Sequence, residues 1–400
     1  MKRGKQPLGC PAAHLDTIIG PGLALALALI AAIASIGCEP DPSPSTEAEP
    51  ASARAAPRRA EEPDASKNVT RIVLDSLARV ERPHVVLIMI DTLRRDHVHA
   101  YGYPRETTPS IDALARSAIR YDRAYSQSSW TTPSTASILT GRYPSQLGVR
   151  KQTDPLPDHA TLLPEILRAH GYRTGAVVSH VFISERWNFD QGYDEFDASN
   201  SRGHAAVTSA SVSDAAIEFI ESSFPQGPSF LLVHYFDPHF DYIEHEDFRF
   251  SEDTDYEGWV KSGMLFGDLR RKRHEMNDDD FRRLLALYDS EIAFTDHHIG
   301  RVLDAIRALG FWDESLVVLS ADHGEEFMEH DKFAHGRTLY EEQIRVPLII
   351  KWPNAKQGAV SRRLVQSIDV LPSLLDYLEV PPPPGIAGAP IQRQTRARPT

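Results

Sequence analysis

Residues 85–91 read Val-Val-Leu-Ile-Met-Ile-Asp, a continuous apolar run that stops at a carboxylate. Such a run is typical of a strand that is covered on both faces, as in parallel sheets. The pattern returns in three later segments, at residues 173–178, 230–235 and 316–320. Helical patterns separate these strands, at residues 110–116, 161–169 and 279–308. This alternation predicts an α/β fold with a mostly parallel central sheet flanked by helices.

The composition indicates a globular chain with a large core, because 41% of its 400 residues are hydrophobic and 25% are charged. Its formal net charge is −13. Nucleic-acid backbones are bound by basic surfaces, so this charge disfavours a nucleic-acid partner. An acidic enzyme fits the composition better. None of these quantities indicates an oligomeric state.

Residues 1–38 are typical of an export signal peptide, because basic residues precede an apolar run at residues 23–34. Residues 35–38, Ser-Ile-Gly-Cys, resemble a bacterial lipobox with serine where leucine is usual. We therefore expect a lipoprotein anchored to the membrane at Cys38. A plain cleaved signal and an uncleaved anchor are the alternatives. Each predicts an exported protein of the bacterial cell envelope, either anchored or free in the periplasm or outside the cell.

Residues 39–72 are rich in Pro, Ala, Ser and Glu and have no hydrophobic period. Such a segment cannot bury enough apolar surface to offset the entropy of ordering. We interpret it as a disordered tether that leads to a catalytic domain at residues 80–392. Cys10 lies in the signal region, so Cys38 is the only cysteine of a processed chain, which excludes a disulfide and a cysteine metal site.

Polar residues follow two of the expected strands. Asp91 ends the first strand, and Asp322 and His323 follow the strand at residues 316–320. A lone Asp after a strand is usually a turn or cap residue, but reactive groups of parallel sheets collect at the carboxyl ends of the strands. Thr131 precedes a helix of small residues and is a further candidate.

Residues 131–142 read Thr-Thr-Pro-Ser-Thr-Ala-Ser-Ile-Leu-Thr-Gly-Arg and resemble the sulfatase signature, C/S-x-P-S-x-A-S-x-x-T-G. Other segments resemble the same family in the same order, among them residues 86–96, 108–115, 171–174, 192–196, 320–325, 345–350 and 367–373. Residues 84–390 are thus similar to the sulfatase and alkaline-phosphatase superfamily. The resemblance implies an alkaline-phosphatase-like sulfatase fold. Members commonly continue into a smaller C-terminal subdomain, which we expect to be short or truncated.

The resemblance implies a divalent-cation site. Its ligands would be Asp91, Asp322 and His323, with Thr131 as both ligand and nucleophile. Oxygen ligands with one imidazole suit Ca²⁺, Mg²⁺ or Mn²⁺, and Zn²⁺ is an alternative.

The resemblance also implies roles for three other side chains. His239 matches a family histidine that contacts the transferred group or protonates the leaving oxygen. Sulfatases usually have a substrate-binding lysine at the position of Gly336, and we expect His335 or Arg337 to stabilise oxyanions in its place. A second metal held by Asp237, His239 and His335 is an alternative.

The sequence departs from the sulfatase pattern at the nucleophile. Sulfatases oxidise a Cys or Ser to formylglycine, and Thr131 cannot form that aldehyde. A divalent cation can instead turn its hydroxyl into a nucleophile. Thr92 and Thr135 also stand where sulfatases often have an Asp and an Arg.

These residues predict a metal-dependent hydrolase or transferase that acts on a small-molecule, glycan or lipid ester. We expect phosphoesters rather than sulfate esters, because an alkoxide attacks phosphorus without formylglycine in related enzymes. A sulfatase that retains activity with threonine is one alternative. The other is a catalytically inactive envelope protein that binds an anionic glycan or lipid.

Overall fold

The computed structural model describes residues 68–201, 208–250 and 256–394. The expected signal peptide at residues 1–38 and the tether up to residue 67 lie outside the described residues. Export, lipid attachment at Cys38 and envelope localisation therefore stay predictions. Within the described ranges, no helix combines the length and the apolar character needed to cross a membrane.

The core of the fold is a nine-stranded sheet, whose strands run in the order β11-β2-β10-β6-β1-β5-β3-β4 with β9 paired to β2. One half consists of parallel strands: β1 (His84–Ile90), β3 (Arg173–Val178), β4 (Glu195–Asp197), β5 (Ser229–Tyr235) and β6 (Ser315–Ala321). The other half contains β2 (Ile119–Tyr125), β9 (Arg345–Val346), β10 (Leu348–Lys351) and β11 (Ala359–Gln366), of which β9 and β10 are antiparallel to their neighbours. The predicted α/β fold with a mostly parallel sheet is confirmed.

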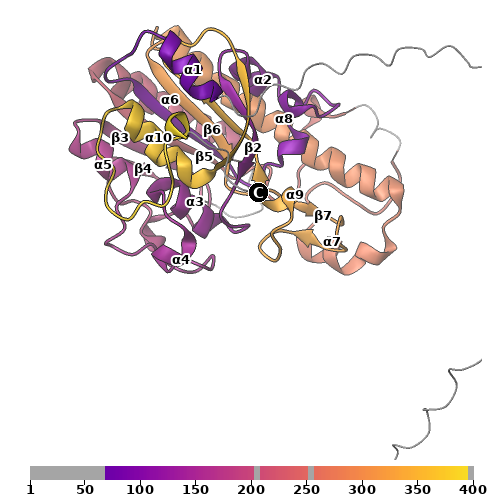
Figure 1. Cartoon of the computed structure of the whole chain (residues 1–400). Helices are drawn as coiled ribbons and strands as arrows, with labels where there is room; N and C mark the ends of the chain where they lie inside the picture. Colours follow the sequence, from indigo (N-terminus) through magenta and orange to yellow (C-terminus); the bar gives the residue numbers. More distant parts are fainter. Residues whose placement is uncertain (1–67, 202–207, 251–255, 395–400) are drawn as a thin grey trace, which may run out of the picture. The chain divides into compact units, whose positions relative to one another are not determined.

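Helices cover this sheet in two groups (Figure 1). The first group consists of α8 (Asp278–Ala308) with α2 (Pro109–Ala115) and α6 (Ser209–Ser223) packed against it. The second consists of α3 (Thr131–Thr140) with α4 (Pro144–Leu147) and α10 (Val370–Tyr377), while α5 (Leu163–Ala169) contacts β3. The predicted helices near residues 110–116, 161–169 and 279–308 are thus present, with ends shifted by one or two residues.

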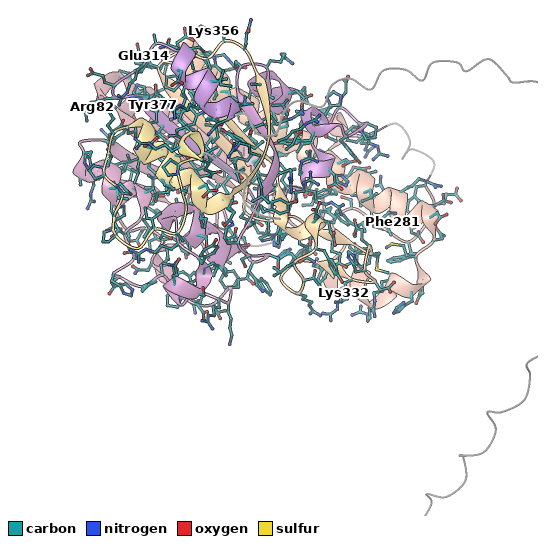
Figure 2. All side chains as sticks on the ribbon, in the orientation of Figure 1. Arg82, Phe281, Glu314, Lys332, Lys356 and Tyr377 are labelled. Atoms are coloured by element: carbon teal, nitrogen blue, oxygen red, sulfur yellow. The ribbon has the colours of Figure 1, made fainter. Side chains whose placement is uncertain are left out.

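A small hairpin of β7 (Glu326–Phe327) and β8 (Phe333–Ala334) lies outside the main sheet. In Figure 1 the hairpin lies in the same part of the molecule as α7 (Phe266–Lys272), α9 (Glu341–Ile344) and the start of α8. The labelled side chains of Phe281 and Lys332 mark this part, at the opposite end of the view from Lys356 and Tyr377 (Figure 2).

The catalytic domain begins before residue 80, which corrects the predicted boundaries. Helix α1 spans Val69–Ser76, so residues 69–72 are helical and do not belong to a tether. Asn68 caps this helix and its side-chain amide donates to the main-chain oxygens of Ile391, at 2.8 Å, and Gln392, at 3.1 Å. The buried hydroxyl of Thr70 lies 2.8 Å from Tyr121 Oη. Long-range contacts therefore order a segment whose composition resembles a linker.

The register of the parallel strands determines where the polar residues meet. Ile90 pairs with Tyr235 of β5 and with Ala321 of β6. The residues that follow these partners, including Asp91 and Asp322, therefore emerge at the same edge of the sheet. The strand β1 is buried throughout, so Asp91 leaves the sheet from within the core.

His84, the first residue of β1, makes the stability of the fold depend on pH. Its ring stacks on Phe224, with centroids 4.0 Å apart and planes inclined by 5°. Burial lowers the pKa of His84 to about 4 from its usual 6.5. Between these pH values the unfolded chain binds more protons than the folded chain, so the free energy of unfolding falls as pH falls.

The free energy of unfolding should fall less between pH 7 and pH 4 in His84→Phe, which keeps the aromatic stack, than in the wild type. We expect the difference to be about 3 kcal/mol. Urea unfolding at a series of pH values measures this effect. Equal pH dependence in His84→Phe and the wild type would contradict the assignment.

Candidate metal and catalytic site

Asp91 is the centre of the candidate site. Its side chain is buried, and within the described part of the chain neither carboxylate oxygen accepts a hydrogen bond. Three imidazole nitrogens surround the carboxylate. His180 Nε2 lies 3.7 Å and His234 Nε2 lies 3.8 Å from Asp91 Oδ2. His323 Nε2 lies 3.8 Å from Asp91 Oδ1. A buried carboxylate without hydrogen bonds is costly unless a cation compensates its charge.

The Asp322-His323 pair follows β6 and faces Asp91. Asp322 Oδ1 accepts hydrogen bonds from the main-chain N–H groups of Thr92 and His323, while Oδ2 accepts none among the described residues. His323 Nδ1 lies 3.0 Å from the carbonyl oxygen of Gly324, which can only accept. Nδ1 therefore carries the proton and Nε2 presents a lone pair. Burial also lowers the pKa of His323, which favours this neutral form.

Thr131 is the first residue of α3 and is completely buried. Its Oγ1 lies 3.2 Å from His323 Nε2. Ser134, one turn later, donates from its hydroxyl to the main-chain oxygen of Asp322 at 2.5 Å, which fastens the start of α3 to the end of β6. The free N–H groups at a helix N-terminus favour negative charge at Thr131.

These four predicted side chains are brought together in a geometry that fits a cation. Asp91, Asp322 and His323 each offer a ligand atom, and these atoms lie within 4.8 Å of one another. His323 Nε2 is 3.2 Å from Thr131 Oγ1 and 3.3 Å from Asp322 Oδ2. Ligands that surround one zinc ion tetrahedrally are about 3.3–3.6 Å apart. These two separations are close to those of groups that share an ion, while the 3.8 Å between His323 Nε2 and Asp91 Oδ1 is slightly longer.

The charges of the site point to the same conclusion. Burial, together with the nearby carboxylates of Asp322 and Glu325, raises the pKa of Asp91 well above its usual value. Burial also raises the pKa of Glu325 to about 8. A divalent cation would offset the repulsion between these carboxylates and keep them ionised.

The turn after Asp91 is held in a strained conformation. Thr92 is β-branched and yet has a φ of 54°, which is unfavourable for such a residue. Tyr288 of α8 holds the turn from both sides, since its hydroxyl donates to Thr92 O at 2.7 Å and accepts from Arg94 N at 2.8 Å. This turn directs the Thr92 N–H toward Asp322 and so positions a predicted ligand.

His239 and His335 lie beside the cation site as part of a chain of imidazole rings. The His335 ring is 4.3 Å from that of His323 and 5.0 Å from that of His239. His335 Nδ1 lies 3.1 Å from Glu325 Oε1, which orients its ring. Both predicted histidines are therefore buried beside the candidate ligand His323.

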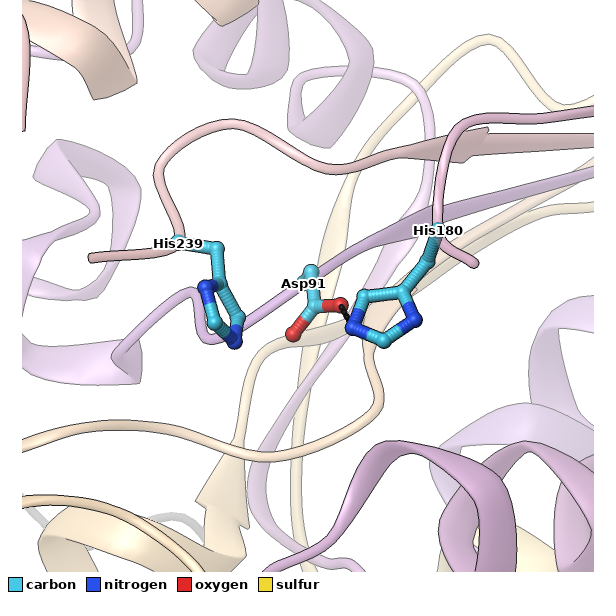
Figure 3. A group of neighbouring side chains, drawn as sticks. All are labelled: Asp91, His180 and His239. Atoms are coloured by element: carbon cyan, nitrogen blue, oxygen red, sulfur yellow. Dashed lines mark ion pairs between the residues drawn. The ribbon is translucent and has the colours of Figure 1, made fainter. Parts of the chain in front are cut away.

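A second group of possible ligands shares Asp91 and consists of Asp91, His180 and His239. Figure 3 shows the Asp91 carboxylate between the two imidazole rings. However, the main-chain N–H of Phe182 donates to His180 Nδ1 at 3.1 Å, so the proton of a neutral His180 is on Nε2. The Nε2–H of His180 therefore faces Asp91 from 3.7 Å, beyond hydrogen-bond distance, in contrast to the lone pair presented by His323.

The alternative second metal at Asp237, His239 and His335 is not supported. Asp237 Oδ2 accepts from the main-chain N–H groups of Thr208 and Ser209, at 3.1 and 2.9 Å, and from the Ser209 hydroxyl at 2.6 Å. The Asp237 carboxylate thus accepts hydrogen bonds from the main-chain N–H groups at the start of α6, rather than binding a metal with His239 and His335.

Arg337 is not placed in the cation cluster. Its side chain is exposed and lines a hollow of about 500 Å³ together with Trp130, Tyr143 and Arg150. The lining includes Trp130, the residue that directly precedes Thr131. Arg337 is thus better placed to contact a distant part of a substrate than the reacting oxygens.

The sequence interpretation missed His180, His234 and Glu325. His180 follows β3, which pairs with β5, so its place just after a strand was an available indication. His234 interrupts the apolar run of β5, and burial lowers its pKa to about 3. Glu325 lies in the segment 320–325 that carried the resemblance, but no role followed from its position.

Gly336 has a structural reason to lack a side chain. Its φ is 83°, and a Cβ atom added there would overlap the ring of Trp130. Trp130 thus occupies the space that a lysine at this position would need. Trp130, the residue before Thr131, packs here in place of the lysine side chain.

The fold is that of sulfo- and phosphoester hydrolases, and the clustered side chains form a candidate divalent-metal site. Residues 83–380 match the protein family described as Sulfatase. The chain belongs to the sulfatase family, whose members generally use a divalent metal.

Relatives of the chain support this assignment. It is 26% identical to the N-acetylglucosamine-6-O-sulfatase of Bacteroides thetaiotaomicron, over 77% of this chain and 70% of the relative. It is 27% identical to arylsulfatase A of Homo sapiens, over 80% of this chain and 67% of the relative. The phosphonate monoester hydrolase of Agrobacterium radiobacter shares the fold, with a TM-score of 0.63 and 18% identity over 77% of this chain and 76% of that structure.

We expect Gly336→Lys, which introduces the residue usual in sulfatases, to lower the free energy of unfolding by about 1–3 kcal/mol. The cause would be the positive φ and the overlap with Trp130. Urea unfolding measures the change, and Arg337→Lys at the neighbouring exposed position is the control. Unchanged stability of Gly336→Lys would show that Trp130 does not restrict this position.

Proposed function

We propose that the protein is a divalent-cation-dependent phosphoester hydrolase in which the Thr131 hydroxyl is the nucleophile. The observation that carries this proposal is the position of Thr131 Oγ1, 3.2 Å from His323 Nε2 within the cluster of buried ligands. A divalent cation bound there lowers the pKa of a hydroxyl ligand and neutralises charge on the substrate.

The reaction proceeds in two steps. Thr131 loses its proton to water and its Oγ1 bonds to phosphorus, while the bond between phosphorus and the leaving oxygen breaks. His239 donates a proton to that oxygen. The oxygen of a water molecule or an acceptor alcohol then bonds to phosphorus while the bond between Oγ1 and phosphorus breaks. His239 takes the proton of the attacking hydroxyl, and Oγ1 regains a proton from solvent. The start of α3 stabilises the negative charge at Oγ1.

The preference for phosphorus rests on how this chain differs from the sulfatase pattern. Thr131 cannot supply a formylglycine. Thr135 stands where sulfatases usually have an Arg. It is buried, and its Oγ1 is 3.9 Å from the sulfur atom of Met89. The nucleophile therefore lacks that positive neighbour and depends more on a cation. Sulfate esters remain the second candidate, because named relatives are sulfatases.

The hollow next to Trp130 is suited to an alcohol group of some size. Aromatic and guanidinium side chains line it, from Trp130, Tyr143, Arg150 and Arg337. Such groups contact sugar rings and anionic headgroups. We therefore propose a glycan or lipid ester as substrate, consistent with a relative named for N-acetylglucosamine.

Thr131→Ala should reduce turnover by about 10³-fold or more, whereas Thr131→Ser should keep measurable activity because it retains the hydroxyl. p-Nitrophenyl phosphate, a bis(p-nitrophenyl) phosphodiester and p-nitrophenyl sulfate, each with Ca²⁺, Mg²⁺, Mn²⁺ or Zn²⁺, are the test substrates. Thr140→Ala at the far end of α3 is the matched control, since its hydroxyl donates only to Ala136 O.

The outcomes of this screen distinguish the proposed function from its alternatives. Undiminished hydrolysis by Thr131→Ala would exclude covalent catalysis at this residue. Faster turnover of the sulfate ester than of both phosphoesters would favour the sulfatase alternative. The absence of turnover with every metal and substrate would favour the inactive binding protein.

His239→Ala should slow the hydrolysis of alkyl phosphoesters by about 10²–10⁴-fold but affect p-nitrophenyl esters much less, because only the poor leaving group needs a proton. The ratio of kcat/KM for the two substrates measures the effect. His297→Ala, at an exposed histidine of α8, should leave the ratio unchanged. Equal losses on both substrates would assign His239 to binding.

A further inference from the structure

A separate group of potential metal ligands lies at the β7–β8 hairpin and includes none of the residues of the candidate active site. It consists of Glu326 in β7, His330 in the turn and Glu342 in α9. One ligand atom from each lies within 4.8 Å of the other two. His330 Nδ1 is 2.8 Å from Glu342 Oε1 and 3.6 Å from Glu326 Oε1.

The two carboxylates point into this cluster with unsatisfied oxygens. Glu326 is only 1% exposed, and its Oε2 accepts from Gln343 Nε2 at 2.7 Å. Its Oε1 and the Oε1 of Glu342 are buried and have no hydrogen-bond partner within the described residues. The short approach of His330 to Glu342 thus lacks hydrogen-bond geometry. A buried carboxylate oxygen in this state requires a positive partner.

Tyr340 fixes the orientation of the imidazole. Its ring stacks on that of His330, with centroids 3.4 Å apart and planes inclined by 8°. Tyr340 is also the N-cap residue of α9, the helix that carries Glu342. The stack therefore holds Nδ1 toward the carboxylates and leaves His330 half-exposed at the surface, where an ion can enter.

The balance of charge favours an ion over a protonated histidine. A protonated His330 between two carboxylates leaves one negative charge in a largely buried position. A divalent cation with two carboxylates and a neutral imidazole leaves none. Carboxylates and imidazoles are both zinc ligands, and ligand atoms of a tetrahedral zinc site are about 3.3–3.6 Å apart. The 3.6 Å between His330 and Glu326 fits this range, whereas His330 and Glu342, at 2.8 Å, must move slightly apart to share an ion.

We propose that Glu326, His330 and Glu342 bind a divalent transition-metal ion, such as Zn²⁺, that fastens the β7–β8 hairpin to α9. Glu325 directly precedes β7 and His335 directly follows β8. The ion thus stabilises the hairpin that holds both residues beside the candidate active site. It takes no part in the reaction, so its presence does not depend on the proposed function.

Zinc content after equilibrium dialysis of the full chain against Zn²⁺ tests this site. Glu342→Gln and His330→Gln should each bind one ion fewer than the wild type. Glu341→Gln is the matched control, because Glu341 is the adjacent residue of α9 and its carboxylate contacts Tyr125 and Arg345 instead. It should bind as many ions as the wild type. Hydrogen exchange of residues 326–334 should slow on Zn²⁺ addition only where the ion binds.

Diffraction from wild-type crystals at the zinc absorption edge provides a test that needs no variant, and a peak between the three side chains is expected. Equal zinc content in the wild type and both variants, or no peak at the cluster, would overturn the proposal and leave a His330 ion pair. Turnover of phosphoesters is measured separately, so failure of this site and failure of the proposed function are distinguishable.

Discussion

The parallel pairing of β1 with both β5 and β6 is the constraint on which the candidate site depends. Ile90 lies level with Tyr235 and Ala321, so the chain segments that follow these three residues leave the sheet together. A shift of one residue in either pairing would turn alternate side chains to the other face and separate Asp91 from Asp322. The apolar residues of β1 are completely buried, and this burial makes such a shift costly.

This arrangement concentrates negative charge inside the protein. Both carboxylate oxygens of Asp91 and Oδ2 of Asp322 are buried and accept no hydrogen bond from the described residues, and Glu325 lies nearby. Burial alone would favour protonated, inactive carboxyl groups. A divalent cation bound here would offset the repulsion and keep the ligands ionised, which would couple metal binding to the folded state. The strained turn at Thr92, held by Tyr288, is a further cost of positioning these ligands.

The differences from the sulfatase pattern form a connected set. Thr131 replaces the residue that becomes formylglycine, Thr135 contacts Met89 where an Arg is usual, and Gly336 leaves room for Trp130 where a Lys is usual. Two positive charges that are usual in sulfatases are thus missing around Thr131. Imidazoles of His180, His239 and His335 surround the same space. A divalent cation bound at the candidate site would supply the positive charge that these two positions lack.

The sequence alone determined the strand runs, the fold class and the convergence of Asp91, Thr131, Asp322 and His323, because each lies in a local pattern whose geometry is known. It missed β2, whose charged residues Arg120, Asp122 and Arg123 interrupt the apolar run. Only the tertiary structure decided that α1 is ordered, that Asp237 caps α6 and that Glu326, His330 and Glu342 form a cluster. These contacts join residues from separate elements, and their partners depend on packing and register, which no local pattern encodes.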